Sequence, residues 1–188
     1  MNRIEKINPF IHLRLHTSYS LLEGAIRPEE LPKLCKEASM PAVGITDSGN
    51  LFGALEISEL LIKGGIQPVI GCQFRFKLNL NRESEEQVKE AHCSSLVLLA
   101  QNEYGYQNLL KLSSEYFLRS NDSILTLNSS QLEDHAAGLI AICGGAKGPL
   151  GLNILRKDMT AANVSAKWFK NLFGDRFYIE IQRHGTGK

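Results

Sequence analysis

Two histidines, an arginine and two carboxylates in the first fifty residues have side chains suited to metal or phosphate chemistry. His12, Arg14 and His16 occupy alternate positions, so in an extended strand all three side chains would point to the same side. Together with Glu23 and Asp47, the two imidazoles could hold zinc, manganese or iron. A His-x-x-x-His pair on a strand is more often a pair of hydrogen-bonded polar residues, and the spacing alone favours that simpler interpretation.

Other candidates for chemistry lie near the end of the chain. The glycine-rich segment 144–149 with Lys147 could cradle a phosphate, but it lacks the complete P-loop pattern and a tight structural turn is the better interpretation. Cys143 ends an apolar run and is typical of a small core residue rather than of a nucleophile. Arg183 and His184 could reach a phosphate or could equally be a solvated strand end.

The pattern of apolar residues predicts alternating strands and helices. Such alternation favours a mostly parallel sheet with right-handed crossovers. In such sheets the catalytic and binding residues lie at the carboxyl ends of the strands. His16, Asp47, Ser48 and Gln73 follow or lie near these ends. Strands are predicted at residues 10–15, 41–46, 67–76 (one or two strands), 96–100, 139–143 and 177–182, helices at 28–39, 51–62, 102–119 and 160–173, and a polar loop at 79–92.

Composition limits the possible classes of protein. A chain of 188 residues with 43% hydrophobic residues can bury one sizeable core. Its formal net charge of +1 argues against an autonomous DNA-binding module. The four cysteines show no CxxC spacing, so neither a structural zinc nor disulfides are expected. With no signal-like or membrane-spanning stretch, we expect a cytoplasmic protein without a membrane partner.

Several further motifs are spread in order along the chain. The first motif is FIHLRLHTSYSLLEGA at residues 10–25. Further motifs follow in the expected order: MPAVGITD at 40–47 with GNLFG at 49–53, GIQPVIGC at 65–72, and LLAQN at 98–102 with GYQNL at 105–109. Together these motifs resemble the opening of bacterial DNA polymerase III alpha subunits, which begin with a polymerase-and-histidinol-phosphatase (PHP) domain, and the chain is identified as a member of the PHP family.

The resemblance implies an α/β fold, namely a distorted, TIM-like β/α barrel of about seven strand-helix units with a metal-lined cleft at the strand ends. Residues 1–188 are then expected to form a partial PHP domain, truncated at the C-terminus, as the N-terminal fragment of a longer polymerase subunit.

Departures from the family pattern fall on the expected metal ligands. A ligand histidine is replaced by Arg14, an aspartate by Glu23, a histidine by Ser48, a glutamate by Gln73 and a histidine by Ser95. We therefore expect a vestigial cleft without a multi-metal centre, in which Arg14 is paired with Glu23 or Asp47. The complete set of predicted cleft residues is His12, Arg14, His16, Glu23, Asp47, Ser48, Gln73, Ser95 and His184, and a residual metal would use His16, Glu23 and Asp47.

Two functions follow from the resemblance. The first is a structural module of a replicative DNA-directed DNA polymerase that docks the proofreading exonuclease subunit and other polymerase III holoenzyme subunits. In this first function, other parts of the full-length polymerase subunit would contact DNA, and Mg²⁺ would be the cofactor of the full-length polymerase. The second is an active metal-dependent phosphoesterase or 3′–5′ exonuclease, which would need Zn²⁺ or Mn²⁺.

Overall fold

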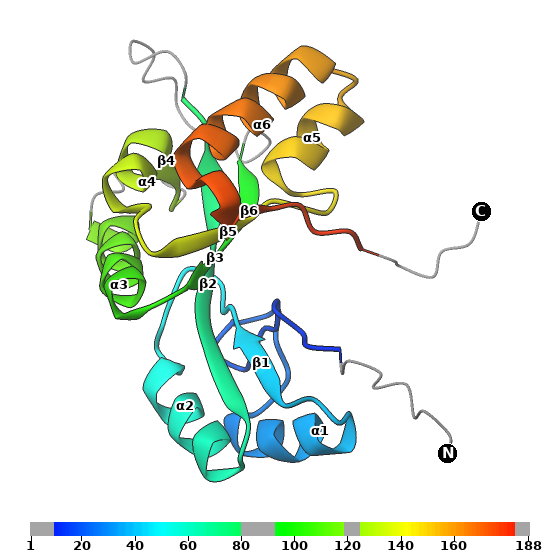
Figure 1. Ribbon diagram of the computed structural model, residues 1–188, viewed down its shortest axis with the longest axis vertical. Helices are drawn as coiled ribbons and strands as arrows, with labels where there is room; N and C mark the ends of the chain where they lie inside the picture. Colours follow the sequence, from blue (N-terminus) through cyan, green and yellow to red (C-terminus); the bar gives the residue numbers. More distant parts are fainter. Residues whose placement is uncertain (1–9, 80–92, 119–124, 183–188) are drawn as a thin grey trace, which may run out of the picture.

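The computed structural model describes residues 10–79, 93–118 and 125–182. Helices α1 and α2 pack beside β1 in one part of the molecule, α3 to α6 lie in the other, and the long strand β2 runs through both (Figure 1). No helix in these residues is long and apolar enough to cross a membrane. The elements are η1 (Pro28–Glu30), α1 (Leu31–Glu37), β1 (Ala42–Ile45), α2 (Ala54–Lys63), β2 (Gln67–Lys77), β3 (Ser94–Ala100), α3 (Glu103–Leu118), β4 (Leu127–Asn128), α4 (Ser129–His135), β5 (Leu139–Ile142), α5 (Pro149–Leu155), α6 (Met159–Phe173), η3 (Gly174–Arg176) and β6 (Phe177–Tyr178).

The strands form one mixed sheet in the order β1-β2-β3-β5-β6, with β4 paired to β2. β1 and β2, β2 and β4, and β5 and β6 are parallel, whereas β3 is antiparallel to both of its neighbours, β2 and β5. The prediction of an α/β fold is confirmed. The sheet is mixed, but β1, β2, β4, β5 and β6 all run in the same direction and β3 alone is reversed, which agrees with the prediction of a mostly parallel sheet except at β3. An apolar run reads the same in either direction, so the hydrophobic pattern carried no information on strand direction.

The two faces of β2 have different surroundings because side chains alternate along a strand. Cys72, Phe74 and Phe76 are fully buried in the larger core cluster, where Phe76 contacts the ring of Phe169 from α6. A smaller cluster packs under α1 and α2 and includes Ile57. The opposite face of β2 carries Val69, which lines a hollow together with Leu99 and Ile140, and Gln73, which belongs to the candidate site.

The prediction of a strand at residues 10–15 is wrong: the chain bends at Leu13, and the segment makes only single hydrogen bonds to β1 instead of a regular ladder. Gly44 N–H donates to the His12 carbonyl (2.7 Å), and Thr46 N–H donates to the Leu15 carbonyl (2.9 Å). The N–H of Leu15 donates to the Thr46 hydroxyl (3.1 Å) instead of to a backbone carbonyl. This side-chain bond competes with strand pairing, which explains the irregular segment.

The other predicted elements agree with the structure apart from their ends and a few short elements. The last predicted strand, 177–182, pairs only at β6, while residues 179–182 pair with no strand among the described residues. The predicted polar loop at 79–92 lies outside the described residues except for Asn79. Sequence reasoning missed β4, α4 and α5; α4 begins with an Asn128–Gln131 capping box, and α5 begins at Pro149.

Candidate functional site: a polar network at the strand ends

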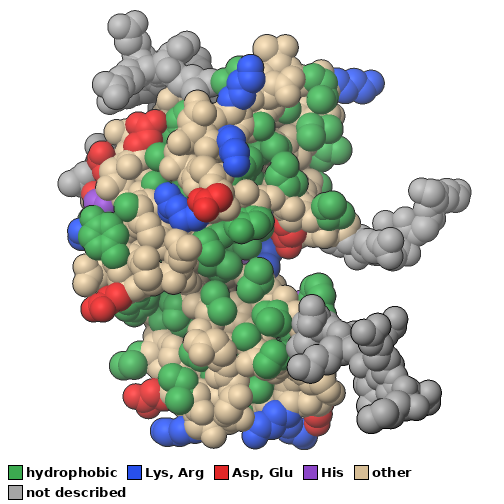
Figure 2. All heavy atoms as spheres, viewed as in Figure 1, with side chains coloured by type: hydrophobic (Ala, Val, Ile, Leu, Met, Phe, Trp, Pro, Cys, Tyr) green, Lys and Arg blue, Asp and Glu red, His purple; other side chains and the backbone are tan. Residues whose placement is uncertain are grey.

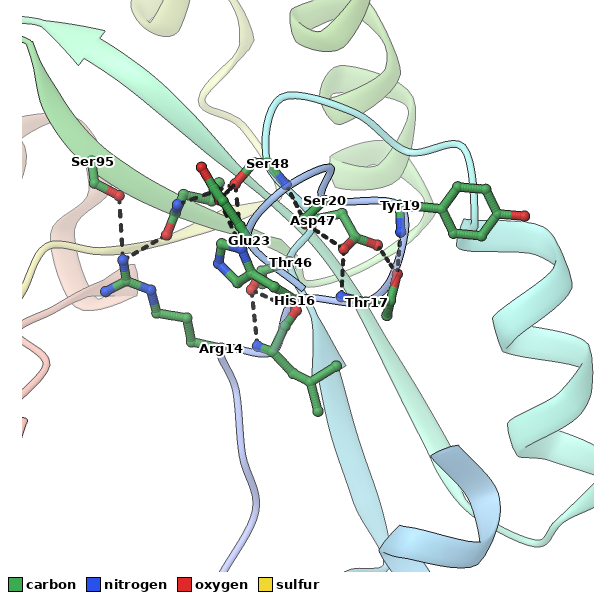
Figure 3. A network of polar contacts seen from close by, with 12 residues as sticks. Arg14, His16, Thr17, Tyr19, Ser20, Glu23, Thr46, Asp47, Ser48 and Ser95 are labelled. Atoms are coloured by element: carbon green, nitrogen blue, oxygen red, sulfur yellow. Dashed lines mark hydrogen bonds and ion pairs between the residues drawn. The ribbon is translucent and has the colours of Figure 1, made fainter. Parts of the chain in front are cut away.

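Asp47 follows β1 and anchors the loop at residues 16–24 (Figure 3). Its side chain is 3% exposed. One carboxylate oxygen accepts hydrogen bonds from the N–H of Thr17 (2.7 Å) and the hydroxyl of Ser20 (2.6 Å), and the other accepts from the Thr17 hydroxyl (2.8 Å). Ser48 N–H donates to the same Ser20 hydroxyl (3.0 Å). The carboxylate is thus engaged by the protein through both oxygens and fixes the loop against the end of β1.

His16, Glu23 and Ser48 meet at the outer side of this loop. The Ser48 hydroxyl donates to Glu23 Oε2 (2.5 Å), and His16 Nδ1 lies 3.2 Å from the same oxygen. Ser48 Oγ and His16 Nδ1 are 3.3 Å apart. Gln73 Nε2 donates to Ser48 Oγ (3.4 Å), which connects the group to β2.

Arg14 joins the beginning of the described chain to its end. One guanidinium nitrogen donates to Glu180 Oε2 (2.9 Å). The other donates to Gln73 Oε1 (2.6 Å) and, less closely, to Ser95 Oγ (3.4 Å). Gln73 therefore connects two parts of the network, since its carbonyl accepts from Arg14 and its amide donates to Ser48.

The predicted partner of Arg14 is corrected by these contacts. Figure 3 shows the Arg14 side chain pointing toward Ser95 and away from His16 and Glu23. Glu23 is instead bonded to Ser48, and Glu180 forms the ion pair. Sequence reasoning missed Glu180; the available signal was a single carboxylate between two isoleucines in a predicted strand.

One predicted cleft residue, His12, is not part of the network. The chain bends at Leu13, and the exposed ring of His12 packs edge-on against Phe10, with ring centroids 4.8 Å apart. His12 therefore does not join Arg14 and His16, because alternation holds only for a regular strand. His184 lies outside the described residues. The network brings together Arg14, His16, Glu23, Asp47, Ser48, Gln73 and Ser95.

The donor set does not fit a multi-metal centre. In the described parts of the chain, no group of three His, Cys, Asp or Glu side chains is placed to hold a metal ion. Of the three predicted ligands, Asp47 is engaged by Thr17 and Ser20, while His16 and Glu23 contact each other. These residues can connect the strand ends through hydrogen bonds. In a metal-binding site, the bound ion makes this connection.

The buried cysteines and the glycine-rich segment are structural. Burial raises the pKa of the Cys72 and Cys143 thiols well above their usual value, so neither is an activated nucleophile. The backbone of segment 144–148 turns tightly, with Gly148 N–H donating to the Gly145 carbonyl (3.2 Å). The Lys147 carbonyl accepts from Ser95 N–H (2.7 Å), which holds the turn against β3.

Comparison with known proteins gives the family. A family model described as the PHP domain matches residues 12–184. The chain belongs to the PHP domain family. DNA polymerase III subunit alpha of Caulobacter vibrioides is 41% identical over 177 residues, which cover 94% of this chain and 15% of the relative. The subunit of the same name from Campylobacter jejuni is 35% identical over 191 residues, which cover 96% of this chain and 16% of the relative.

These matches confirm the resemblance to polymerase III alpha subunits and lie in the N-terminal portion of the relatives. The chain spans about 15% of the length of these relatives. A solved amidohydrolase structure from Chromobacterium violaceum is 13% identical with a TM-score of 0.47, over 81% of this chain and 73% of that one.

Proposed function

We propose that residues 1–188 serve as part of the PHP domain of a DNA polymerase III alpha subunit, as a structural and docking module in bacterial DNA replication. The observation that carries this proposal is the Arg14 network. A permanent cation stands at an expected ligand position and bonds to Glu180, Gln73 and Ser95. Such a network stabilises the strand ends without a metal, because each polar group is satisfied by another side chain.

The curved sheet supports a further proposal about the fold. Residues 10–14 and 178–181 line the same hollow and are connected by the Arg14–Glu180 ion pair. No pairing links β1 to β6 within the described residues. We take the sheet as the larger part of a PHP-type barrel of about seven strand-helix units, with the remaining wall supplied by polypeptide that the longer relatives possess.

The proposed partners follow from the relatives. In a polymerase III holoenzyme, this domain would contact the proofreading exonuclease subunit, while DNA and Mg²⁺ would be bound by other parts of the polymerase. The formal net charge of +1 is consistent with a domain that makes little electrostatic contact with DNA. The expected compartment is the cytoplasm.

One contact favours the alternative, an active metal-dependent phosphoesterase or 3′–5′ exonuclease. His16 Nδ1 and Glu23 Oε2 lie 3.2 Å apart near the surface, and Glu23 is 51% exposed. Both side chains are potential ligands for Zn²⁺ or Mn²⁺, with Asp47 nearby as the third candidate. Bound metal would supply an activated water for phosphoester hydrolysis.

The two functions are separated by assaying the purified chain in two ways. We expect no hydrolysis of p-nitrophenyl phosphate or of single-stranded DNA with Zn²⁺ or Mn²⁺, and we expect binding to the proofreading exonuclease subunit in a sedimentation assay. Metal-dependent hydrolysis that is lost in both His16→Ala and Glu23→Gln would support the alternative. Failure to bind the exonuclease subunit would contradict the docking role.

A further inference from the structure

Exposed apolar side chains lie on the loops that carry the polar network as well as at the waist of the molecule. Figure 2 shows the waist, between the part with α1 and α2 and the part with α3 to α6. On the network loops, Leu21 is 83% exposed, Leu22 is fully exposed and Phe52 is 72% exposed. We call Leu21, Leu22 and Phe52 the apolar rim.

The two loops of the apolar rim are joined to each other and to α3. Asn50 Nδ2 donates to the Tyr19 carbonyl (3.1 Å), and the Phe52 N–H donates to Asn50 Oδ1 (3.2 Å). The Phe52 ring stacks on Phe117 of α3, with ring centroids 6.3 Å apart. The apolar rim is therefore presented to solvent in one defined arrangement.

Leu22 has a backbone conformation that is unfavourable for a leucine. Its φ of +65° lies in the left-handed region. The N–H groups of Glu23 and Gly24 both donate to the Ser20 carbonyl (3.0 and 2.9 Å), which closes a tight turn around Leu22. The exposed side chain gains no packing in return for this strain. A strained residue that presents an apolar side chain to solvent is typical of a contact surface.

Carboxylates border the apolar rim. The Tyr19 hydroxyl donates to Glu56 (2.6 Å), and the pKa of Tyr19 is raised, first by this hydrogen bond and further by the negative charges of Glu29 and Asp47. Within the described ranges, Glu23, Glu29 and Glu56 form no ion pair with a lysine or arginine. An apolar surface with acidic neighbours is complementary to an apolar segment that carries basic residues.

We infer that the apolar rim is the docking surface for the proofreading exonuclease subunit, which covers it with an apolar segment that carries Lys or Arg. This inference rests on the proposed function and adds to it the surface and the chemistry of the partner segment. Because the donor set does not fit a multi-metal centre, a protein can cover these loops without blocking one.

The test is calorimetric titration of the 188-residue chain with the exonuclease subunit of the same organism. Leu22→Gly should raise the dissociation constant about tenfold, because one leucine side chain is lost from the contact. The same variant should not lower the melting temperature, since glycine adopts a positive φ without strain and the leucine side chain packs against nothing. A structural role for Leu22 predicts the opposite, a lower melting temperature with unchanged affinity.

The acidic border is tested by Glu56→Gln, which keeps an acceptor for the Tyr19 hydroxyl. It should raise the dissociation constant about threefold at low salt and leave it unchanged at high salt, where exposed charges are screened. An equal dissociation constant for Glu56→Gln and the parent at low salt would contradict the basic character of the partner segment.

The matched control for Leu22→Gly is Lys157→Gly, because Lys157 is also exposed and has a φ of +62°, in the turn between α5 and α6. It should leave the dissociation constant unchanged. Equal affinity of Leu22→Gly and the parent, or equal weakening by Lys157→Gly, would overturn the inference and leave the proposed function standing. A parent chain that does not bind the subunit would overturn the proposed function and the inference with it.

Discussion

Arg14 is held by partners from three separate parts of the chain. Glu180 follows β6, Gln73 lies in β2 and Ser95 lies in β3. A guanidinium group suits this position because its planar fork can donate to several acceptors and keeps its charge at every relevant pH. The residue at an expected metal-ligand position therefore supplies a connection between the strands.

Asp47 is the most buried charged residue of the network, so its hydrogen bonds should contribute strongly to stability. Asp47→Asn replaces one acceptor oxygen by an NH₂ group that faces hydroxyl or N–H donors of Thr17 or Ser20. We expect a loss of about 2–4 kcal/mol in the free energy of unfolding. Urea denaturation measures it, with Asp134→Asn on the exposed side of α4 as the control. Equal unfolding midpoints for the two variants would show that the Asp47 bonds are energetically unimportant.

At the scale of elements, the spacing of apolar residues was sufficient to predict a helix that has one buried face. In α2 the buried residues are Ala54, Ile57 and Leu61, and this spacing predicted the helix. The pairing of Arg14 with Glu180 joins residues 166 positions apart. Local patterns contain no information on such a contact, nor on the direction of β3. The irregular segment before β1 was also unpredictable, since it depends on which side chain accepts from the Leu15 N–H.

Gly44 sets the distance between residues 10–15 and β1, because Leu13 packs directly against its Cα. A Cβ at Gly44 would lie 2.6 Å from the Leu13 carbonyl oxygen, so Gly44→Ala must displace the backbone. We expect a loss of about 1–3 kcal/mol in unfolding free energy, with faster hydrogen exchange at the Gly44 and Thr46 amides. Gly65→Ala is the comparison, since a Cβ there meets nothing within 4 Å and only the positive φ of +76° is strained.

The Gly65→Ala variant should lose about 1 kcal/mol from the positive φ alone and leave exchange at Gly44 and Thr46 unchanged. If both variants exchange alike at these two amides, the close approach of Leu13 to β1 does not hold the segment in place.

At the scale of the whole molecule, two kinds of surface meet at Arg14 and Glu180. The polar network connects the strand ends (Figure 3), and an apolar hollow is lined by Val69, Leu99 and Ile140. The Arg14–Glu180 ion pair belongs to both, because both residues also line the hollow. The ion pair thus connects the two ends of the described chain. Its loss should therefore lower the free energy of unfolding of the whole chain.

The most direct test of a cleft held by side chains in place of metal is thermal unfolding of the parent chain and Arg14→Ala, each with and without Zn²⁺ or Mn²⁺. Arg14→Ala removes the partner of Glu180, whose side chain is 23% exposed, and should cost about 1–3 kcal/mol. Arg27→Ala, at an exposed position before η1, is the control and should match the parent. We predict a lower melting temperature for Arg14→Ala and no change with metal for any of the three. A melting temperature of Arg14→Ala equal to that of the parent, or a rise in the parent's melting temperature at micromolar metal, would contradict the proposal.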